Sequence, residues 1–266
     1  MNYFISRPDG RIAYDDTGGE GPLIVCVPGM GDTRKSFRFI APALADNGNR
    51  VVTMDLRGHG ESDATFGAYS PDLIGADIVA LLQHLKAGPA YLLGVSIGSD
   101  AAPWAATEAP ELVKGLMLVR AYPPGQALPF MQRMLVKVLL ARPWAALAWS
   151  KVFASFFPTS PPSDLAAYQR QLRTMLREPG RADALRRMAN SSKDLVHARM
   201  PQVSQPALVV MGAADQGDPQ QDGQSVADAV SGQLVLIDKA GHYPHVEAPE
   251  PTLRALVAFQ NEVNHA

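Results

Sequence analysis

Six short apolar runs, with helix-like segments between many of them, constrain the fold of this chain more than any other feature. They are rich in Val, Ile and Leu and read LIVCV, RVVTM, AYLLG, VKGLMLV, ALVVM and QLVLI. Continuous apolar runs of this length are typical of strands buried on both faces of a parallel sheet. Strands that alternate with helices predict a mainly parallel sheet covered on both sides. Ligands bind such sheets outside the carboxyl ends of the strands.

Two local patterns agree with this architecture. Pro8-Asp9-Gly10 is a turn sequence between YFIS and RIAYDD, so we expect the chain to open with a β-hairpin. Further on, SPDLIGADIVALLQHL places Ser70 as a candidate N-cap before Pro71 at the first helical position. Its apolar side chains recur at helical spacing, which predicts a helix with one buried face.

One region interrupts the alternation of strands and helices. From about residue 122 to residue 200 the segments look helical, with many prolines and large aromatic side chains. The sequence therefore predicts a core in two parts, 1–121 and 201–266, separated by a helical insertion over 122–200. The insertion is either a set of extra helices packed on the core or a lid whose apolar underside covers a pocket, and the sequence leaves both open.

Charge and composition narrow the class of partner. The 266 residues include 24 Lys and Arg against 26 Asp and Glu, so no excess positive charge favours nucleic acid or an anionic membrane. The longest apolar-rich stretch, LVKVLLARPWAALAWSKVFASFF, carries too many charges to span a bilayer. The N-terminus lacks the pattern of a signal peptide, and Cys and His lack metal-ligand spacing. We expect a small-molecule substrate, a cytoplasmic location, no metal and no cofactor, with the oligomeric state left open.

A serine between two glycines is the first candidate for chemistry. The pattern G-x-S-x-G in LLGVSIGSDAA arises by chance in roughly one chain of this size in ten, so alone it is a weak signal. Its context is more specific, because Ser96 follows a strand-like run and precedes a helix-compatible segment, as a nucleophile elbow requires. In that turn, side chains at Gly94 and Gly98 would collide with nearby backbone. The alternative is an ordinary turn that carries a surface hydroxyl.

A nucleophilic serine needs a base and a carboxylate that orients the base. Among six histidines, His242 follows the QLVLI run in the loop DKAGHYPHVEAPE, where a base can overhang the carboxyl edge of the sheet. His245 on the same loop is the weaker candidate. The run ALVVMGAADQGDP ends a strand and offers Asp215 and Asp218, and the order Ser, Asp, His is the one this architecture uses.

Taken together, the motifs resemble those of the α/β-hydrolase superfamily, in particular its small cap-bearing serine esterases and cofactor-free peroxidase-like members. VPGMGD is similar to the oxyanion loop, DLRGHGESD to the Asp-x-Arg-Gly-x-Gly-x-Ser-Asp loop and GVSIG to the elbow, while GAADQGDP and AGHYPHVEAPE resemble the acid and histidine loops. The resemblance covers nearly the whole chain. It implies an eight-stranded, mainly parallel α/β-hydrolase sheet with helices on both faces and a helical cap. It also implies Ser96 as nucleophile, Asp215 as acid, His242 as base, and the Met30 and Ile97 amides as oxyanion donors.

Two motifs depart from the family pattern. The oxyanion loop usually reads His-Gly and here reads Pro28-Gly29, which keeps the backbone donor but leaves the support of the loop unexplained. The acid loop is usually apolar between its Asp and Pro, whereas here it reads Gln216-Gly217-Asp218.

Four side chains are candidates for a substrate pocket. They are Arg120, Tyr122, Trp144 and Phe153. Arg120 ends its strand at the ligand side of the sheet, so it faces either an anionic group of the substrate or a nearby carboxylate. The aromatic content of the insertion predicts an apolar acyl site.

The predicted reaction is transfer of an acyl group to water through a serine ester, without a cofactor. The same three side chains also support perhydrolysis, cleavage of lactones or C–C bonds, and hydroxynitrile lysis. A receptor or scaffold that binds a small ligand without turnover is the alternative from another class.

Overall fold

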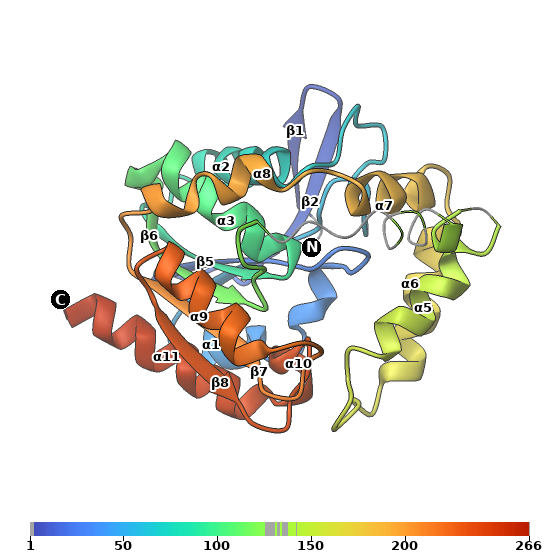
Figure 1. Ribbon diagram of the computed structural model, residues 1–266. Helices are drawn as coiled ribbons and strands as arrows, with labels where there is room; N and C mark the ends of the chain where they lie inside the picture. The colour runs from blue at the N-terminus through green and yellow to red at the C-terminus, as the bar shows by residue number, and fades with distance from the viewer. Residues whose placement is uncertain (1–2, 126–130, 132–133, 135–137, 142, 266) are drawn as a thin grey trace.

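The centre of the molecule is an eight-stranded sheet (Figure 1). The computed structural model describes residues 3–125, 131, 134, 138–141 and 143–265, and in this part of the chain the strand order is β1-β2-β4-β3-β5-β6-β7-β8. The strands are β1 Tyr3–Arg7, β2 Gly10–Asp16, β3 Leu23–Val27, β4 Arg50–Met54, β5 Ala90–Val95, β6 Val113–Val119, β7 Ala207–Gly212 and β8 Gln233–Ile237. β1 and β2 form an antiparallel hairpin, β2 pairs antiparallel with β4, and the remaining neighbours are parallel.

The six apolar runs form the strands β3 to β8, so the predicted mainly parallel sheet is confirmed. Strands β3 and β5 to β7 are almost wholly buried, as the absence of polar alternation indicates. The prediction was wrong for β8, where Gln233 is exposed and the next three residues are only partly buried. Among the described residues β8 is the last strand of the sheet, so its outer edge is not paired with another strand.

Helices cover both faces of the sheet. On one face, apolar side chains of α2 (Pro71–Leu85), α3 (Ile97–Glu108) and α9 (Pro219–Ala229) form a continuous buried cluster with the strands. On the other face, α1 (Ala41–Asp46) and α11 (Pro249–His265) do the same. α2 begins at Pro71 as predicted, although the Ser70 side chain makes no capping hydrogen bond. These layers leave the carboxyl ends of β3, β5, β6, β7 and β8 at one edge of the sheet.

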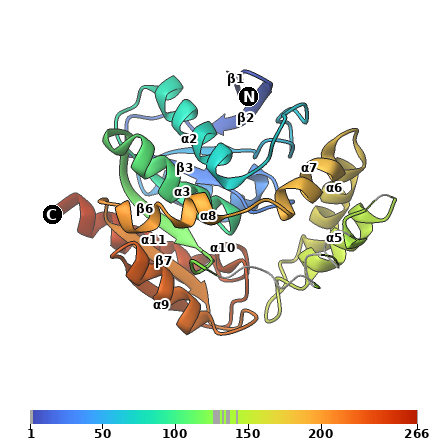
Figure 2. The same cartoon turned by 45° about the horizontal axis from the view of Figure 1, so that its top comes forward.

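Between β6 and β7 the chain forms α5 (Ala145–Ala154), α6 (Leu165–Arg177), α7 (Arg181–Ala189) and the short α8 (Asp194–His197). Figures 1 and 2 show α5, α6 and α7 set to one side of the sheet, whereas α8 returns beside α2 and α3. We refer to α5, α6 and α7 together as the β6–β7 helices. Parts of the predicted insertion, at 126–130, 132–133, 135–137 and 142, lie outside the described residues.

Buried aromatic and leucine side chains attach the β6–β7 helices to the core. Trp149 and Phe153 of α5, and Tyr168 and Leu172 of α6, belong to the same buried cluster as α1 and α11. Because α5 and α6 share buried apolar surface with the core, they are packed on it.

Candidate active site

Ser96 lies at a strained turn between β5 and α3. Its φ of 53° and ψ of −115° form a backbone conformation that a serine adopts only when its surroundings enforce it. A Cβ on Gly94 would lie 2.4 Å from the Gly98 carbonyl oxygen, and a Cβ on Gly98 would lie 2.3 Å from the Val27 oxygen. Both glycines are therefore required by close backbone approach. The alternative of an ordinary surface turn does not fit, because Ser96 is only 9 % exposed.

The backbone groups predicted as oxyanion donors lie on both sides of this serine. Ile97 is the first residue of α3, and the first N–H groups of a helix have no acceptor within the helix. Met30 follows β3, the strand beside β5, in a turn between Gly29 and Gly31. A Cβ on Gly29 would lie 3.5 Å from the Ser96 Cβ, so the turn passes directly beside the serine. The backbone segments that carry the two predicted donors thus both lie next to Ser96.

The β6–β7 helices support the turn that departs from the family's His-Gly pattern. Trp149 of α5 donates its indole N–H to the Gly31 oxygen at 2.9 Å. The Tyr168 hydroxyl of α6 donates to Asp32 Oδ1 at 2.5 Å and lies 3.0 Å from the Thr33 hydroxyl. Burial raises the pKa of Asp32 to about 6, although the Tyr168 hydrogen bond opposes the shift. This turn is therefore held by contacts with segments far away along the chain.

His242 lies on the loop after β8 and is almost completely buried. Its Nδ1 is 3.2 Å from Asp215 Oδ2, which leaves Nε2 as the acceptor nitrogen of the neutral ring. The Phe156 ring stacks on the imidazole at 4.3 Å between centroids and 21° between planes, and the Tyr122 ring lies at 6.3 Å. The backbone N–H of His242 donates to the Phe156 oxygen at 3.1 Å. The imidazole is thus oriented by a carboxylate and enclosed by aromatic rings.

Electrostatics keep the His242 ring neutral and the Asp215 carboxyl ionised. Burial lowers the pKa of His242; the Asp215 hydrogen bond and charge oppose this, while the positive charges of Arg120 and Lys193 add to it. Burial would raise the pKa of Asp215, but the His242 hydrogen bond and the charges of His242 and Arg120 outweigh it and hold that pKa below its ordinary value. A neutral base beside an ionised carboxylate is the state that proton abstraction requires.

Asp218, the alternative acid, has another structural role. It is exposed and occupies the N-cap position of α9, where its side chain accepts a hydrogen bond from the Gln221 N–H at 3.0 Å. Aspartate is favoured at this position because it satisfies one of the free N–H groups of the helix. Of the two predicted carboxylates, the structure brings only Asp215 to the His242 ring.

Arg120 is the first residue after β6, with a φ of 54° and a buried side chain. The sequence left open a substrate anion or a nearby carboxylate as its partner, and in the structure its Nε forms an ion pair with Asp215 Oδ2. Its guanidinium also lies 4.4 Å from the centre of the Tyr122 ring. The ammonium of Lys193 lies 3.8 Å from the same ring and pairs with Asp100 at 2.6 Å. Both cations beside the site therefore have carboxylate partners.

Of the four predicted pocket residues, Arg120 and Tyr122 lie together near His242, whereas Phe153 and Trp144 do not contact that ring. Tyr122 lies near His242, as described above. Phe153 is 1 % exposed and packs inside an aromatic cluster with Phe156, Phe157, Tyr168 and Tyr243. Trp144 is 49 % exposed and donates its indole N–H to the Val138 oxygen. Phe153 thus packs against Phe156, which in turn stacks on His242. Trp144 lies at the surface, at the N-terminal end of α5.

Other histidines have structural partners. His245 is fully buried, with Nε2 2.9 Å from the Ser36 hydroxyl, and burial lowers its pKa to about 3. His59 is also fully buried, with its Nδ1 3.0 Å from the Arg57 oxygen, and burial lowers its pKa to about 4. These rings are held neutral inside the fold, away from any described contact with Ser96.

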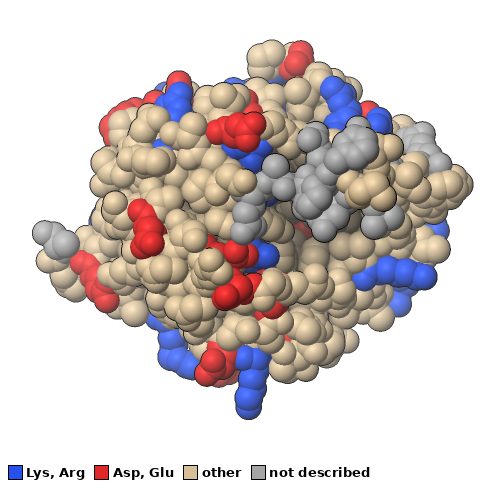
Figure 3. Space-filling view, in the orientation of Figure 1, with Lys and Arg blue, Asp and Glu red and all other residues tan. Residues whose placement is uncertain are grey.

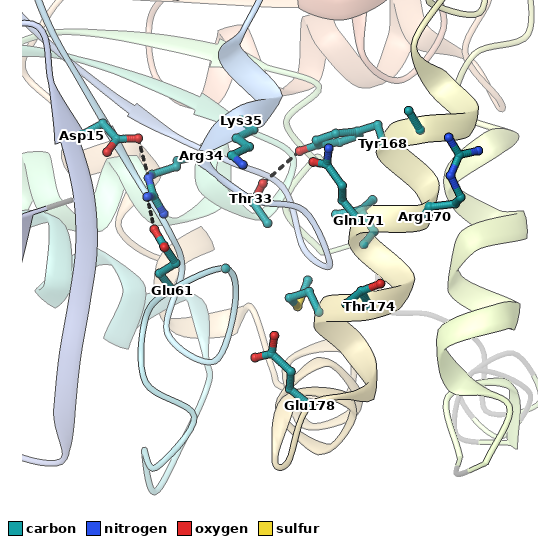
Figure 4. Close-up of a pocket in the computed structure, with 14 residues that line it drawn as sticks. Asp15, Thr33, Arg34, Lys35, Glu61, Tyr168, Arg170, Gln171, Thr174 and Glu178 are labelled. Carbon is teal, nitrogen blue, oxygen red and sulfur yellow. Dashed lines mark hydrogen bonds and ion pairs between the residues drawn. The ribbon is translucent and has the colours of Figure 1, made fainter. Parts of the chain in front are cut away.

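A groove of about 670 Å³ is lined in part by Thr33, Arg34 and Lys35, which follow the turn at residues 29–31 (Figure 4). Its walls include Asp15, Thr33, Arg34 and Glu61 of the core and Tyr168, Gln171 and Thr174 of α6. Figure 4 shows Arg34 bonded between the carboxylates of Asp15 and Glu61, so its charge is already compensated. Among the described residues that line the groove, none is a predicted site residue.

Surface charge, possible metal ligands and the apolar character of the helices relate to which partners the protein can bind. Figure 3 shows basic and acidic side chains interspersed on one face, without an extended patch of either sign. Within the described ranges, no three His, Cys, Asp or Glu side chains are grouped to hold a metal ion. None of the helices in the described part of the chain combines the length and apolar character that crossing a membrane requires.

The sequence of the chain matches a known protein family and several characterised relatives. The α/β-hydrolase fold family matches residues 22–249, so the chain belongs to that family. The chain is similar to 3-oxoadipate enol-lactonase 2 of Acinetobacter baylyi, with 28 % identity over 216 residues that cover 80 % of this chain and 79 % of the lactonase. It is 27 % identical to 2-(acetamidomethylene)succinate hydrolase of Mesorhizobium japonicum, covering 97 % and 96 % of the two chains. A solved esterase of Thermogutta terrifontis superimposes with a TM-score of 0.81 at 26 % identity, over 99 % of both chains.

The sequence interpretation missed several side chains that contact a predicted site residue or the turn beside Met30. They are Trp149, Phe156, Tyr168 and Lys193. The only available signal was the aromatic content of the insertion, because each contact joins segments far apart along the chain.

Proposed function

We propose that this protein is a serine hydrolase that cleaves a small, largely apolar carboxylic ester through Ser96, His242 and Asp215. The observation that carries the proposal is the strained Ser96 turn at the carboxyl end of β5, with a neutral His242 oriented by Asp215 at the ends of neighbouring strands. Backbone strain of this kind is maintained at sites where it has a function.

The reaction would proceed in two acyl-transfer steps. Nε2 of His242 takes the Ser96 proton as the hydroxyl oxygen attacks the ester carbonyl, and the Met30 and Ile97 amides stabilise the oxyanion. The imidazolium is stabilised by Asp215 and returns the proton to the leaving alcohol. Water, activated by the same ring, then attacks the acyl-serine and releases the acid and the free enzyme.

The choice of an ester rests on the relatives and on the surroundings of the base. The three named relatives are a lactonase, an esterase and a hydrolase of an acetamidomethylene compound, and hydrolysis at a carbonyl group is the chemistry that we transfer to this chain. Phe156 and Tyr122 make the side of His242 aromatic, which favours an apolar substrate. We further propose that residues 122–200 act as a cap between the core segments 1–121 and 201–266.

Turnover of p-nitrophenyl esters from acetate to octanoate tests the proposed function. Each buried methylene contributes about 0.8 kcal/mol, so kcat/KM should rise by about threefold to fourfold per carbon until the acyl site is full, and then fall. A lactone and an anilide with the same acyl group as the preferred ester distinguish an esterase from a lactonase and an amidase. Saturable binding of these compounds without turnover would contradict a hydrolase and favour a small-ligand receptor. Turnover that does not depend on acyl chain length would contradict the apolar acyl site but not the hydrolase activity.

The acid limb of the pH profile tests whether the charge of Arg120 lowers the pKa of His242. The base must be neutral, so kcat/KM should fall as pH drops through a pKa of His242 that lies below its ordinary value. Replacing Arg120 with Met removes a positive charge that lowers this pKa, so the acid limb should move to higher pH. The variant should lose at least about twofold more activity at the acid end of the profile than at pH 8.

Arg11→Met provides the control, because Arg11 is an exposed arginine paired with Asp63. Its pH profile should coincide with that of the unmodified protein. An Arg120→Met profile with an unmoved acid limb would show that this charge does not act on the base.

A further inference from the structure

Glu247 connects two segments of the chain that are far apart in sequence. It ends α10 (Pro244–Glu247) and is buried. Its Oε1 accepts hydrogen bonds from the Thr159 and Ser160 N–H groups, both at 2.6 Å, and its Oε2 accepts one from the Gly241 N–H at 2.6 Å. Thr159 and Ser160 follow α5, whereas Gly241 lies on the loop after β8. One carboxylate therefore joins the segment after α5 to the histidine loop.

Both of the connected segments touch His242. Gly241 directly precedes it, and the segment after α5 carries Phe156, whose oxygen accepts the His242 N–H and whose ring stacks on the imidazole. A Cβ on Gly241 would lie 2.3 Å from Pro158 Cδ and 2.8 Å from the Phe156 oxygen, so the two segments are in direct contact. The two peptide units on either side of Gly241 are thus anchored, one to Glu247 and the other to the Phe156 oxygen.

Only a carboxylate satisfies these three donors at once. Each of its oxygens accepts hydrogen bonds, and here both face backbone N–H groups. A glutamine of the same shape has one NH2 group, which would face either Gly241 or the pair Thr159 and Ser160. In either orientation the NH2 group faces at least one backbone N–H. That buried or partly buried N–H then loses its acceptor, which destabilises the folded state.

We infer that Glu247 is a positioning residue for the catalytic base, holding residues 156–160 over His242 and fixing the histidine loop to them. This inference rests on the proposed function, in which His242 is the base. Glu247 contacts neither the imidazole nor Ser96 in any described interaction, so it acts through Gly241 and Phe156. Small displacements of a base from its working geometry cost up to about a hundredfold in rate.

Loosening this contact also changes the environment of the His242 ring. Its charged neighbours are Asp215 after β7, Arg120 after β6 and Lys193 before α8, and the ionisable rings near it are Tyr122, Tyr243 and His245. Replacing Glu247 leaves these groups in the chain. Because burial is the largest cause of the lowered His242 pKa, water admitted beside a displaced Phe156 ring should raise that pKa.

The experiment compares Glu247→Gln with Glu250→Gln, the same change at an exposed position three residues later. For Glu247→Gln we expect kcat on a p-nitrophenyl ester to fall by about tenfold to a hundredfold with KM within about threefold, and the acid limb to move to higher pH. Glu250→Gln should match the unmodified protein. Unchanged kcat and acid limb in folded Glu247→Gln would overturn the inference.

A double-mutant cycle with Phe156→Leu separates positioning from general destabilisation. If Glu247 acts through the segment that carries Phe156, the kcat losses of the two changes are less than multiplicative, whereas independent effects multiply. Multiplicative losses would overturn the proposed route. If Glu247→Gln does not fold, Phe156→Leu alone decides: a lower kcat with unchanged KM and a raised acid limb supports the inference, and an unchanged kcat overturns it.

An NMR titration of the histidine ring protons makes the test independent of turnover. The His242 signal is assigned by its loss in His242→Gln, and its midpoint should be higher in Glu247→Gln and in Phe156→Leu than in the unmodified protein. An inactive unmodified protein would contradict the proposed function, and the titration would still decide whether Glu247 holds the segment over His242. An unchanged midpoint in both variants would overturn the inference even if the protein hydrolyses esters.

Discussion

Ser96→Ala should lower kcat for ester hydrolysis by about three decades or more while the protein stays folded. Alanine keeps the Cβ and the strained backbone of the turn but has no hydroxyl, so only oxyanion stabilisation and substrate binding remain. Steady-state kinetics on one p-nitrophenyl ester, with a thermal melt, measures both effects. KM should change little, because the missing atom acts in the chemical step.

Ser99→Ala is the matched control on the same helix. Its hydroxyl shares its one hydrogen between the Gly94 oxygen at 2.7 Å and the Val119 oxygen at 2.8 Å, so its loss should lower stability by about 1–3 kcal/mol and leave kcat within about tenfold. A fluorophosphonate probe should label the peptide that contains Ser96 in the unmodified protein and in Ser99→Ala, but not in Ser96→Ala. An active Ser96→Ala protein would exclude the serine mechanism, and a label on another residue would relocate the nucleophile.

Local apolar patterns were sufficient to predict most of the sheet. LIVCV, VKGLMLV and QLVLI coincide with β3, β6 and β8, and the Pro8-Asp9-Gly10 turn lies within the β1–β2 hairpin. The strand order and the antiparallel pairing of β2 with β4 were outside the reach of these patterns. A run of Val and Ile reports burial but not which strand lies beside it, because the neighbour is set by crossover connections and sheet twist.

The site was predictable where each residue follows a strand and less so where it depends on contacts across the fold. The chain position of Ser96, Asp215 and His242 indicated a shared edge of the sheet, and the structure brings Asp215 and His242 together there. The turn at Gly29–Gly31 is contacted by Trp149, and the neighbouring Asp32 by Tyr168, both more than a hundred residues away along the chain. No local pattern encodes such a contact, so the sequence alone could not predict what holds the Pro28-Gly29 turn.

The assignment of the acid makes the second large prediction, because two aspartates follow β7 within one short loop. If Asp215 orients the base, Asp215→Asn should lower kcat by up to about four decades. An asparagine can donate its NH2 to Nδ1 of His242, which places the ring proton on Nε2 and removes the acceptor that Ser96 needs. The change also leaves the buried Arg120 with a neutral partner, so we expect the melting temperature to fall by a few degrees.

Asp218→Asn is the matched change three residues on, and it should lower kcat by less than about tenfold. Asparagine caps a helix about as well as aspartate, so the hydrogen bond to the Gln221 N–H and the melting temperature should both be retained. Measuring kcat for both variants on one ester, with thermal melts, distinguishes the two carboxylates. Because the predicted effects differ by about three decades, they exceed any loss that a few degrees of destabilisation can cause at assay temperature. If Asp218→Asn instead shows the large loss of kcat and Asp215→Asn the small one, the assignment of the acid is wrong. Ser96 and His242 would keep their proposed roles.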